Sequence, residues 1–439
     1  MLKKLSNKHI FLGYFSHFLN VSIGLLLLPL IFKYIDSTGV SFWFTMITLG
    51  SLIQMLELGL LPTITRHIAY LYSGVEKITY NNNPERKDSS ISEKKILKYI
   101  RDSENIYKLL SVSVLFFIGI IGSIFVFYTY QDISYVYVWS IFLLSYVINL
   151  YFNFLVGLVQ GTNNHYINFI SIIIQRLLIL ILSVLSIKFY GLYGIVGSFF
   201  IAILISKLFL LIKITNIIDL KKIYNLNFTL KINKDVIKAS LDLGIVQIST
   251  FLSQRFSILY LVNFVTIEEH NKYSLTTTLL YTIFSFSSFY CNSKIATLSS
   301  CIVENNNDLL KKEVKSIFFN STILYVSLVL FSLFSFDFIT RNFSFSMELL
   351  DDELLLFFMF VIFLELIHAI SSIVISTFNS IPFKKSAIIT SLSICIIQIF
   401  LIPFFGVYAL ISVFFICNLI YNNWYWPLFC YRKVFRAKI

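Results

Sequence analysis

The chain has 439 residues, of which 57% are hydrophobic and only 13% are charged. Soluble domains carry roughly 25% charged residues, so this composition excludes a soluble globular protein and indicates a polytopic membrane protein. The formal net charge of +12 would suit a nucleic-acid-binding protein. However, the lysines and arginines occur in short loops beside apolar segments, as in proteins with positively charged cytoplasmic loops. We therefore expect the bilayer as a partner and no nucleic acid.

Twelve apolar segments are each long enough to cross a bilayer as a helix, which takes about 20 residues. They lie near 10–32, 40–62, 107–129, 135–158, 167–188, 193–213, 240–264, 273–295, 316–337, 354–377, 386–404 and 408–430. The sequence thus predicts an all-α integral membrane protein. Six spans precede and six follow a basic linker, which predicts an N-lobe at 1–213, a cytoplasmic linker at 214–239 and a C-lobe at 240–439. We expect the two six-helix lobes to be related by a parallel pseudo-repeat.

The distribution of positive charge predicts the orientation. If the loops are assigned alternately to the two sides, 28 of the 35 lysines and arginines fall on the side that holds both termini, and four fall on the other side. Because cytoplasmic loops carry the excess of lysine and arginine, we expect both termini to be cytoplasmic.

Cationic residues inside the spans are the first candidates for function. Arg255 lies about 15 residues into the seventh span, roughly 22 Å along a helix, and Arg176 lies near mid-depth in the fifth. A charge in hydrocarbon costs at least about 2.5–3.5 kcal/mol unless it faces water or a partner. We therefore predict a water-filled cationic cavity that binds phosphate, which guanidinium groups contact in a bidentate manner. The alternative is a structural Arg–Glu pair that holds two helices together. The predicted lining residues are Arg255, Arg176, Gln254, Gln247 and Asn153.

Two further residues could couple transport to an ion. Glu365 and His368 lie three residues apart and so on one helix face. They are candidates for proton or sodium coupling, and the alternative is a neutral hydrogen-bonded pair. We expect Lys207 to extend its ammonium group to the cytoplasmic interface.

The sequence favours neither an enzyme nor a metalloprotein. It contains no G-x-S-x-G, no H-E-x-x-H and no phosphate-cradling glycine-rich loop. The five cysteines have no metal-like spacing and indicate neither a disulfide framework nor zinc. We expect no catalytic residues, no metal and no cofactor other than a coupling proton or sodium ion.

Three segments of the first half carry a family resemblance. They are Phe42-Trp43-Phe44, the run from Glu57-Leu58-Gly59 through Thr63-Ile64-Thr65-Arg66 to Tyr70, and Gly157-Leu158-Val159-Gln160-Gly161-Thr162-Asn163-Asn164. With the opening segment from Leu12-Gly13 to Tyr34, the chain resembles the Wzx-type O-antigen flippases of the multidrug/oligosaccharidyl-lipid/polysaccharide exporter superfamily.

The resemblance implies a two-lobed transporter with twelve helices in the bacterial inner membrane. It would flip undecaprenyl-pyrophosphate-linked oligosaccharide units from the cytoplasmic to the periplasmic leaflet by alternating access. A polysaccharide polymerase and a chain-length regulator are candidate partners. Glu57 stands where relatives often have aspartate, and Arg66 matches the arginine of the motif, so we expect a gating role for both, as an ion pair if Arg66 folds back.

Two other functions remain open from the sequence. A small-molecule or drug antiporter of the same superfamily should have a net acidic cavity. This function is disfavoured because mid-span arginines outnumber mid-span acids. A polysaccharide polymerase or ligase is disfavoured because the predicted external loops are short.

Overall fold

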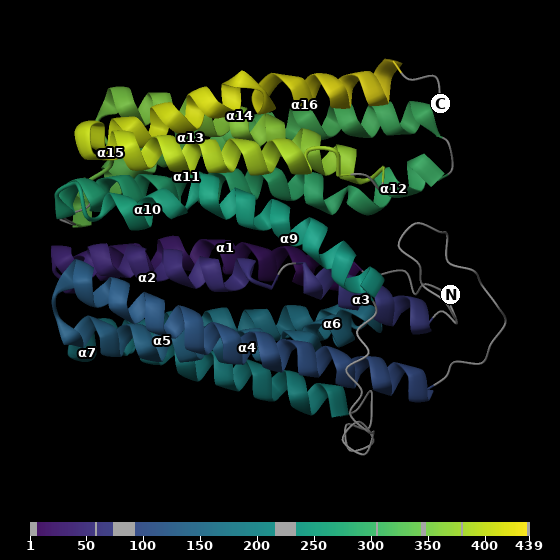
Figure 1. Cartoon of the computed structure of the whole chain (residues 1–439), viewed down its shortest axis with the longest axis horizontal. Coiled ribbons are helices and arrows are strands. Elements are labelled where there is room, and N and C mark those ends of the chain that lie inside the picture. The colour runs from purple at the N-terminus through teal and green to yellow at the C-terminus, as the bar shows by residue number, and fades with distance from the viewer. Residues whose placement is uncertain are drawn as a thin grey trace. The chain divides into compact units, whose positions relative to one another are not determined.

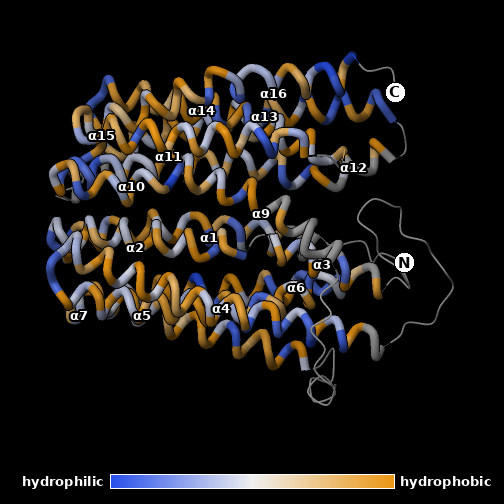
Figure 2. Tube along the Cα trace, in the orientation of Figure 1, coloured by the Kyte–Doolittle hydropathy of each residue, from blue (hydrophilic) through white to orange (hydrophobic). Residues whose placement is uncertain are grey.

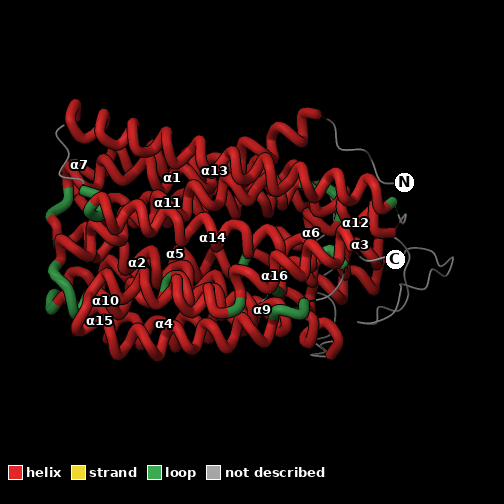
Figure 3. Tube along the Cα trace, turned by 90° about the horizontal axis from the view of Figure 1, so that it is seen from above, coloured by secondary structure: helices red, strands yellow, loops and turns green. Residues whose placement is uncertain are grey.

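The structure is a computed structural model that describes residues 7–57, 59–72, 93–215, 234–303, 306–343, 348–378 and 381–436. In these ranges the chain forms helices and loops and no strand (Figure 3). The prediction of an all-α protein is therefore confirmed for the described residues. Contacts divide the chain into two compact units. Unit 1 comprises Met1–Leu30 and Thr45–Ile248, and unit 2 comprises Ile31–Phe44 and Ser249–Ile439.

The first half of the chain forms seven of the described helices, several of which meet at short breaks. They are α1 (Asn7–Tyr34), α2 (Ser37–Met55), α3 (Leu60–Tyr72), α4 (Glu93–Tyr130), α5 (Ile133–Tyr151), α6 (Asn153–Gly161) and α7 (His165–Thr215) (Figure 1). Local chemistry explains where α5 begins. The Asp132 carboxylate accepts a hydrogen bond of 2.8 Å from the backbone N–H of Ser134, and so satisfies one of the free donors of a helix start.

The second half follows a similar succession of long and short helices. They are α9 (Lys234–Gln254), α10 (Phe256–Leu261), α11 (Ile267–Ser293), α12 (Ile295–Val303), α13 (Asn307–Phe343), α14 (Asp352–Ser376), α15 (Lys384–Ile420), α16 (Asn422–Tyr431) and a short π-helix, η1 (Arg432–Arg436). α9 begins at Lys234, inside the predicted linker 214–239. Residues 216–233 of that linker lie outside the described residues.

Two helices fold back on themselves at a glycine. Gly191 in α7 has φ 53° and ψ −131°, and Gly406 in α15 has φ 51° and ψ −129°. This backbone conformation favours glycine because a Cβ atom would be strained there. The Ser171 hydroxyl donates a hydrogen bond to the carbonyl of Ser206 at 3.1 Å, so the two arms of α7 lie side by side. In α15, the same is true of the arms on either side of Gly406, because the Gln398 amide donates to the carbonyl of Leu410 at 3.0 Å.

Eight helical stretches in the described residues are long and apolar enough to cross a membrane. The stretch at α7 has 51 residues, roughly 77 Å if straight, and its hairpin accommodates two of the predicted spans. α11 is not among these stretches, because beyond its charged start it is rich in serine, threonine and tyrosine. The count of twelve spans, the pseudo-repeat, the division into lobes and the cytoplasmic termini stay predictions.

Each unit buries one face of its helices and leaves apolar side chains outside. Along α14, Ile362, Leu366, Ile370 and Val374 follow one another every four residues, and all are 0% exposed. Phe360 on the same helix is 51% exposed. Exposed apolar side chains are what a surface in contact with lipid requires, and Figure 2 shows that hydrophobic residues recur along the whole length of the long helices.

Close packing of α6 on α3 depends on two glycines of the segment that carries the family resemblance. A Cβ atom added at Gly161 would lie 2.6 Å from the Cβ of Ile68 and 2.8 Å from the carbonyl oxygen of Thr65. One added at Gly157 would lie 3.0 Å from Cγ2 of Ile64. Small residues four apart let membrane helices approach closely, so these glycines bring α3 and α6 together.

Candidate functional site

Unit 1 contains a buried polar network at the break between α2 and α3. Glu57 lies in this break and accepts hydrogen bonds from the Tyr107 hydroxyl of α4 and from the Asn153 amide at 3.3 Å. The Lys207 ammonium of α7 donates to the carbonyl oxygen of the same Asn153 side chain at 3.4 Å. We call Glu57, Tyr107, Asn153 and Lys207 the unit-1 network. One asparagine thereby bridges a carboxylate and an ammonium group inside the helix bundle.

The position of Lys207 corrects the sequence prediction. Its side chain does not reach an interface with water, because the residue is only 6% exposed. An ammonium ion buried without compensation would cost several kcal/mol, and the opposite charge of Glu57 acts on it through the network. Periodicity could not reveal this pairing, since Glu57 and Lys207 belong to helices far apart in the sequence.

Arg176 lies on the first arm of α7 and is half-buried. Its positive charge is close enough to Lys207 and to the Tyr146 hydroxyl for electrostatic interaction. Within the described residues, Arg176 has no carboxylate ion-pair partner, and its Nε–H has no hydrogen-bond acceptor. Among the described residues, Arg176 and Lys207 are thus neighbouring cations, and the carboxylate of Glu57 acts on Lys207.

Unit 2 contains a second polar cluster at the break between α9 and α10. Arg255 separates these helices with φ −125° and ψ −31°, and its guanidinium lies 4.9 Å from the ring centroid of Tyr281. The adjacent Gln254 donates its amide to Glu365 at 3.3 Å, and His368 Nδ1 lies 3.7 Å from the other oxygen of Glu365. We call Gln254, Arg255, Tyr281, Glu365 and His368 the unit-2 cluster.

The unit-2 cluster joins residues that the sequence assigned to two different roles. Gln254 and Arg255 were predicted to bind substrate, while Glu365 and His368 were predicted to couple transport to an ion. Arg255 has no carboxylate ion-pair partner within the described ranges, and its aromatic partner supplies a cation–π contact instead. Gln254, the neighbour of Arg255 in the chain, thus contacts the residues predicted for ion coupling.

The remaining predicted residues are placed as follows. Gln247 is exposed on α9, two turns before Gln254. Arg66 belongs to α3, but its side chain lies outside what the structure describes, so its ion pair with Glu57 stays a prediction. Arg176 belongs to unit 1 and Arg255 to unit 2. That both line one cavity also stays a prediction.

Sequence reasoning missed the tyrosines that complete both groups. Tyr107 is 50 residues away from Glu57, and Tyr281 lies on a different helix from Arg255. In an apolar span, a tyrosine has the pattern of an interfacial aromatic residue, so no sequence signal identified these partners. No group of three His, Cys, Asp or Glu side chains suited to a metal occurs among the described residues, and the five cysteines are free and buried.

No protein-family model and no curated protein sequence matches the chain. Several solved structures match its fold over nearly its whole length. An outward-facing multidrug resistance MATE-family transporter of the MOP superfamily is 12% identical, with 98% of this chain and 96% of that chain covered and a TM-score of 0.62. A MOP-superfamily transporter from Pyrococcus furiosus is 11% identical, with 97% and 95% covered and a TM-score of 0.62. The lipid II flippase MurJ in an inward closed conformation is 15% identical, with 98% and 87% covered and a TM-score of 0.59. The chain therefore has the multi-pass membrane fold of the MOP-superfamily transporters.

Proposed function

We propose that this protein is a flippase for lipid-linked oligosaccharides. Its substrate would be an undecaprenyl-pyrophosphate-linked O-antigen unit, moved from the cytoplasmic to the periplasmic leaflet of the bacterial inner membrane. The polar head of such a lipid cannot cross hydrocarbon unaided, so it needs a path lined by polar groups. A flippase of a lipid-linked molecule, the lipid II flippase MurJ, is among the solved structures with this fold. A polysaccharide polymerase and a chain-length regulator are the proposed protein partners.

The observation that carries this proposal concerns two guanidinium groups that lack a carboxylate partner among the described residues. In the described part of the chain, neither Arg176 nor Arg255 is held by a carboxylate. A structural role would call for such a partner, because a cation inside a membrane protein is costly without compensation. A bound diphosphate would supply the missing negative charge through charge-assisted, bidentate hydrogen bonds.

The two groups of polar residues then have distinct proposed roles. Arg176, Lys207, Asn153 and Gln247 in unit 1, and Arg255 and Gln254 in unit 2, bind the diphosphate and sugar head. Glu57, with Arg66, controls access to the site, since its carboxylate competes with the substrate for the charge of Lys207. Glu365 and His368 couple the cycle to a proton or a sodium ion. Alternating access requires two arrangements of similar free energy, which the substrate or the coupling ion shifts.

A second candidate function is multidrug antiport, which is favoured by the MATE transporters of the same fold. Glu57 and Glu365 would then attract a cationic drug. The MOP-superfamily transporter from Pyrococcus furiosus has a binding pocket of reverse polarity, which suggests a different function for that protein. The fold thus accommodates pockets of different charge. The excess of Arg176, Lys207 and Arg255 over these two carboxylates favours an anionic substrate here.

Complementation tests the proposal. The gene is expressed in a strain that lacks its own O-antigen flippase but makes the matching lipid-linked unit, and surface polysaccharide is measured on gels. Arg176→Ala and Arg255→Ala are compared with the parent at equal membrane abundance. Lys33→Ala is the matched control, because Lys33 is an exposed cation on α1.

We expect the parent and Lys33→Ala to restore polysaccharide, and Arg255→Ala to reduce it at least tenfold. Arg255→Lys should recover part of the loss, since it keeps the charge but not the bidentate geometry. No restoration by a correctly inserted parent would refute the flippase function. Protection of the same cells against cationic drugs by the parent, lost in Glu365→Gln, would establish antiport instead.

A further inference from the structure

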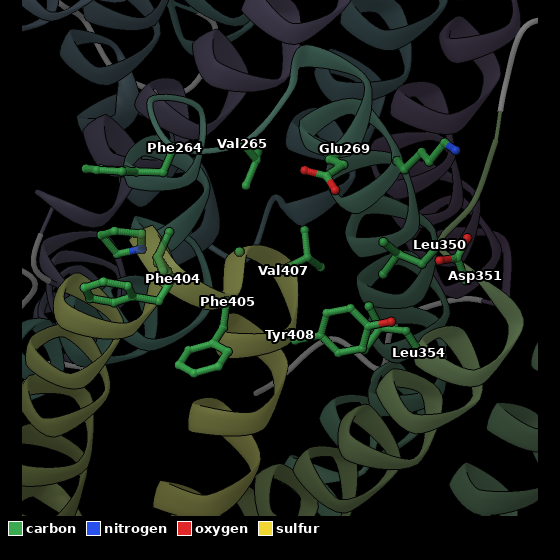
Figure 4. A pocket seen from close by; sticks show the side chains of 14 residues that line it. Phe264, Val265, Glu269, Leu350, Asp351, Leu354, Phe404, Phe405, Val407 and Tyr408 are labelled. Atoms are coloured by element: carbon green, nitrogen blue, oxygen red, sulfur yellow. The ribbon is translucent and has the colours of Figure 1, made fainter.

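Unit 2 contains a cavity of about 580 Å³, separate from the unit-2 cluster, at one end of its helices. Its walls come from the connection between α10 and α11, the start of α14 and the turn of α15 at Gly406 (Figure 4). Ligand pockets in proteins usually measure about 300–1,000 Å³, so this cavity is large enough for a small polar group with part of its apolar attachment. None of the residues assigned to transport lines it.

One wall of the cavity is aromatic and faces outward. Phe404, Phe405 and Tyr408 flank the Gly406 turn, and they are 80%, 61% and 60% exposed. The turn lies between the predicted spans 386–404 and 408–430, where hydrocarbon gives way to the headgroup region. Exposed phenylalanines at this depth are well placed against acyl chains, because burying them there removes apolar surface from water.

The opposite wall carries carboxylates. Figure 4 shows Glu269 and Asp351 across the cavity from Phe264, Phe404 and Phe405. Asp351 precedes the first turn of α14, but its side chain makes no capping hydrogen bond. Lys272 also lines the cavity, but its ammonium group is paired with Glu268 at 3.1 Å and Glu348 at 2.7 Å.

This pairing leaves the cavity with excess negative charge. Glu268 and Glu348 lie outside the lining and already compensate Lys272. Among the described residues, Glu269 and Asp351 have no ion-pair partner of their own. A ligand that suits this arrangement has a cationic group with several N–H donors on one side and an apolar portion on the other.

We propose that this cavity binds the headgroup of an aminophospholipid, with its primary ammonium between Glu269 and Asp351 and its acyl chains over Phe404 and Phe405. An ammonium group offers three donors to the two carboxylates. A choline headgroup has no N–H donor, and an anionic headgroup such as phosphatidylglycerol is repelled by both carboxylates. This site goes beyond the proposed flippase function and does not depend on it.

Native mass spectrometry of the delipidated full-length protein tests the site. The protein is incubated separately with phosphatidylethanolamine, phosphatidylcholine and phosphatidylglycerol of identical acyl chains, and retained lipid adducts are compared. The double variant Glu269→Gln/Asp351→Asn removes both lining charges. The matched control is Asp352→Asn/Glu353→Gln, which removes two exposed carboxylates of the same helix start that do not line the cavity.

We expect the parent and the control variant to retain several-fold more phosphatidylethanolamine than phosphatidylcholine, and least phosphatidylglycerol. The double variant should lose this preference while its melting temperature without lipid stays that of the control. Equal retention of the three lipids by the parent, or an unchanged preference in the double variant, would overturn the proposal. The readout is lipid binding and not polysaccharide transport. A negative result here would therefore leave the flippase proposal standing, and a failed complementation test would leave this lipid site standing.

Discussion

The contact between α3 and α6 offers a sharp test of how this fold is held together. In Gly161→Ala, the new methyl group would lie 2.6 Å from the Cβ of Ile68 and 2.8 Å from the carbonyl oxygen of Thr65. Neither neighbour is the flexible end of a side chain, so the two helices must move apart. Overpacking of this kind costs about 1–3 kcal/mol, while alanine gains up to about 1 kcal/mol over glycine within a helix. The difference of these two contributions is a net destabilisation of between about 0 and 3 kcal/mol.

Gly24→Ala is the matched control, because no atom lies within 4 Å of a Cβ added at Gly24. This variant should be neutral or up to about 1 kcal/mol more stable, since only the helix propensity changes. Denaturant unfolding of the purified protein in detergent, followed by tryptophan fluorescence, measures both free energies of unfolding. The separation of α3 and α6 should also lengthen the hydrogen bond of 3.3 Å between the Thr65 hydroxyl and Gln160. If Gly161→Ala is as stable as Gly24→Ala, the glycine does not set the approach of these helices.

Three further predictions concern stability. His270, which precedes the predicted span 273–295, is fully buried, and burial lowers its pKa from 6.5 to about 4. The unfolded chain therefore binds a proton at His270 more readily than the folded chain. The contribution of the neutral imidazole to the free energy of unfolding is fully present above about pH 6.5, and it falls by about 3 kcal/mol toward pH 4. An equal loss of stability in acid by His270→Gln would contradict this. A double-mutant cycle of Lys207→Met and Glu57→Gln should give a coupling free energy of about 1–3 kcal/mol, and simple additivity would show that Asn153 does not transmit their interaction. Gly406→Ala should destabilise by about 1–3 kcal/mol because of its positive φ, whereas Gly197→Ala, with no atom within 4 Å of the added Cβ, should not; equal melting temperatures of the two variants would refute the strain.

Hydropathy was sufficient to predict the long helices, because a span must satisfy its backbone within itself and expose apolar side chains to lipid. It could not locate the breaks at Glu57 and Arg255, which interrupt continuous apolar runs. Nor could it show that the arms of α7 are joined at a single glycine. These features depend on backbone conformation and on contacts between helices, which leave no periodic signal in one sequence.

The candidate residues show the same limit. Cost arguments predicted that Arg176, Arg255 and Glu365 face inward, since a charge rarely faces lipid. The same argument placed Lys207 wrongly, because its long side chain could equally have reached water. Which residues meet, such as Gln254 with Glu365 or Asn153 with Lys207, is decided by helix packing. Sequence separation gave no indication of these contacts.

The hairpins at Gly191 and Gly406 also have a consequence for how the protein is assembled. Each joins two long apolar arms through essentially one residue, so the entropy lost when the arms meet is close to the minimum for any pair of helices. Contacts that are local in the chain form fastest. We therefore expect each hairpin to form as a unit as soon as its second arm has entered the bilayer, before its arms pack against helices made earlier. Within each half of the chain, the last-synthesised pair of arms would dock as a preassembled piece.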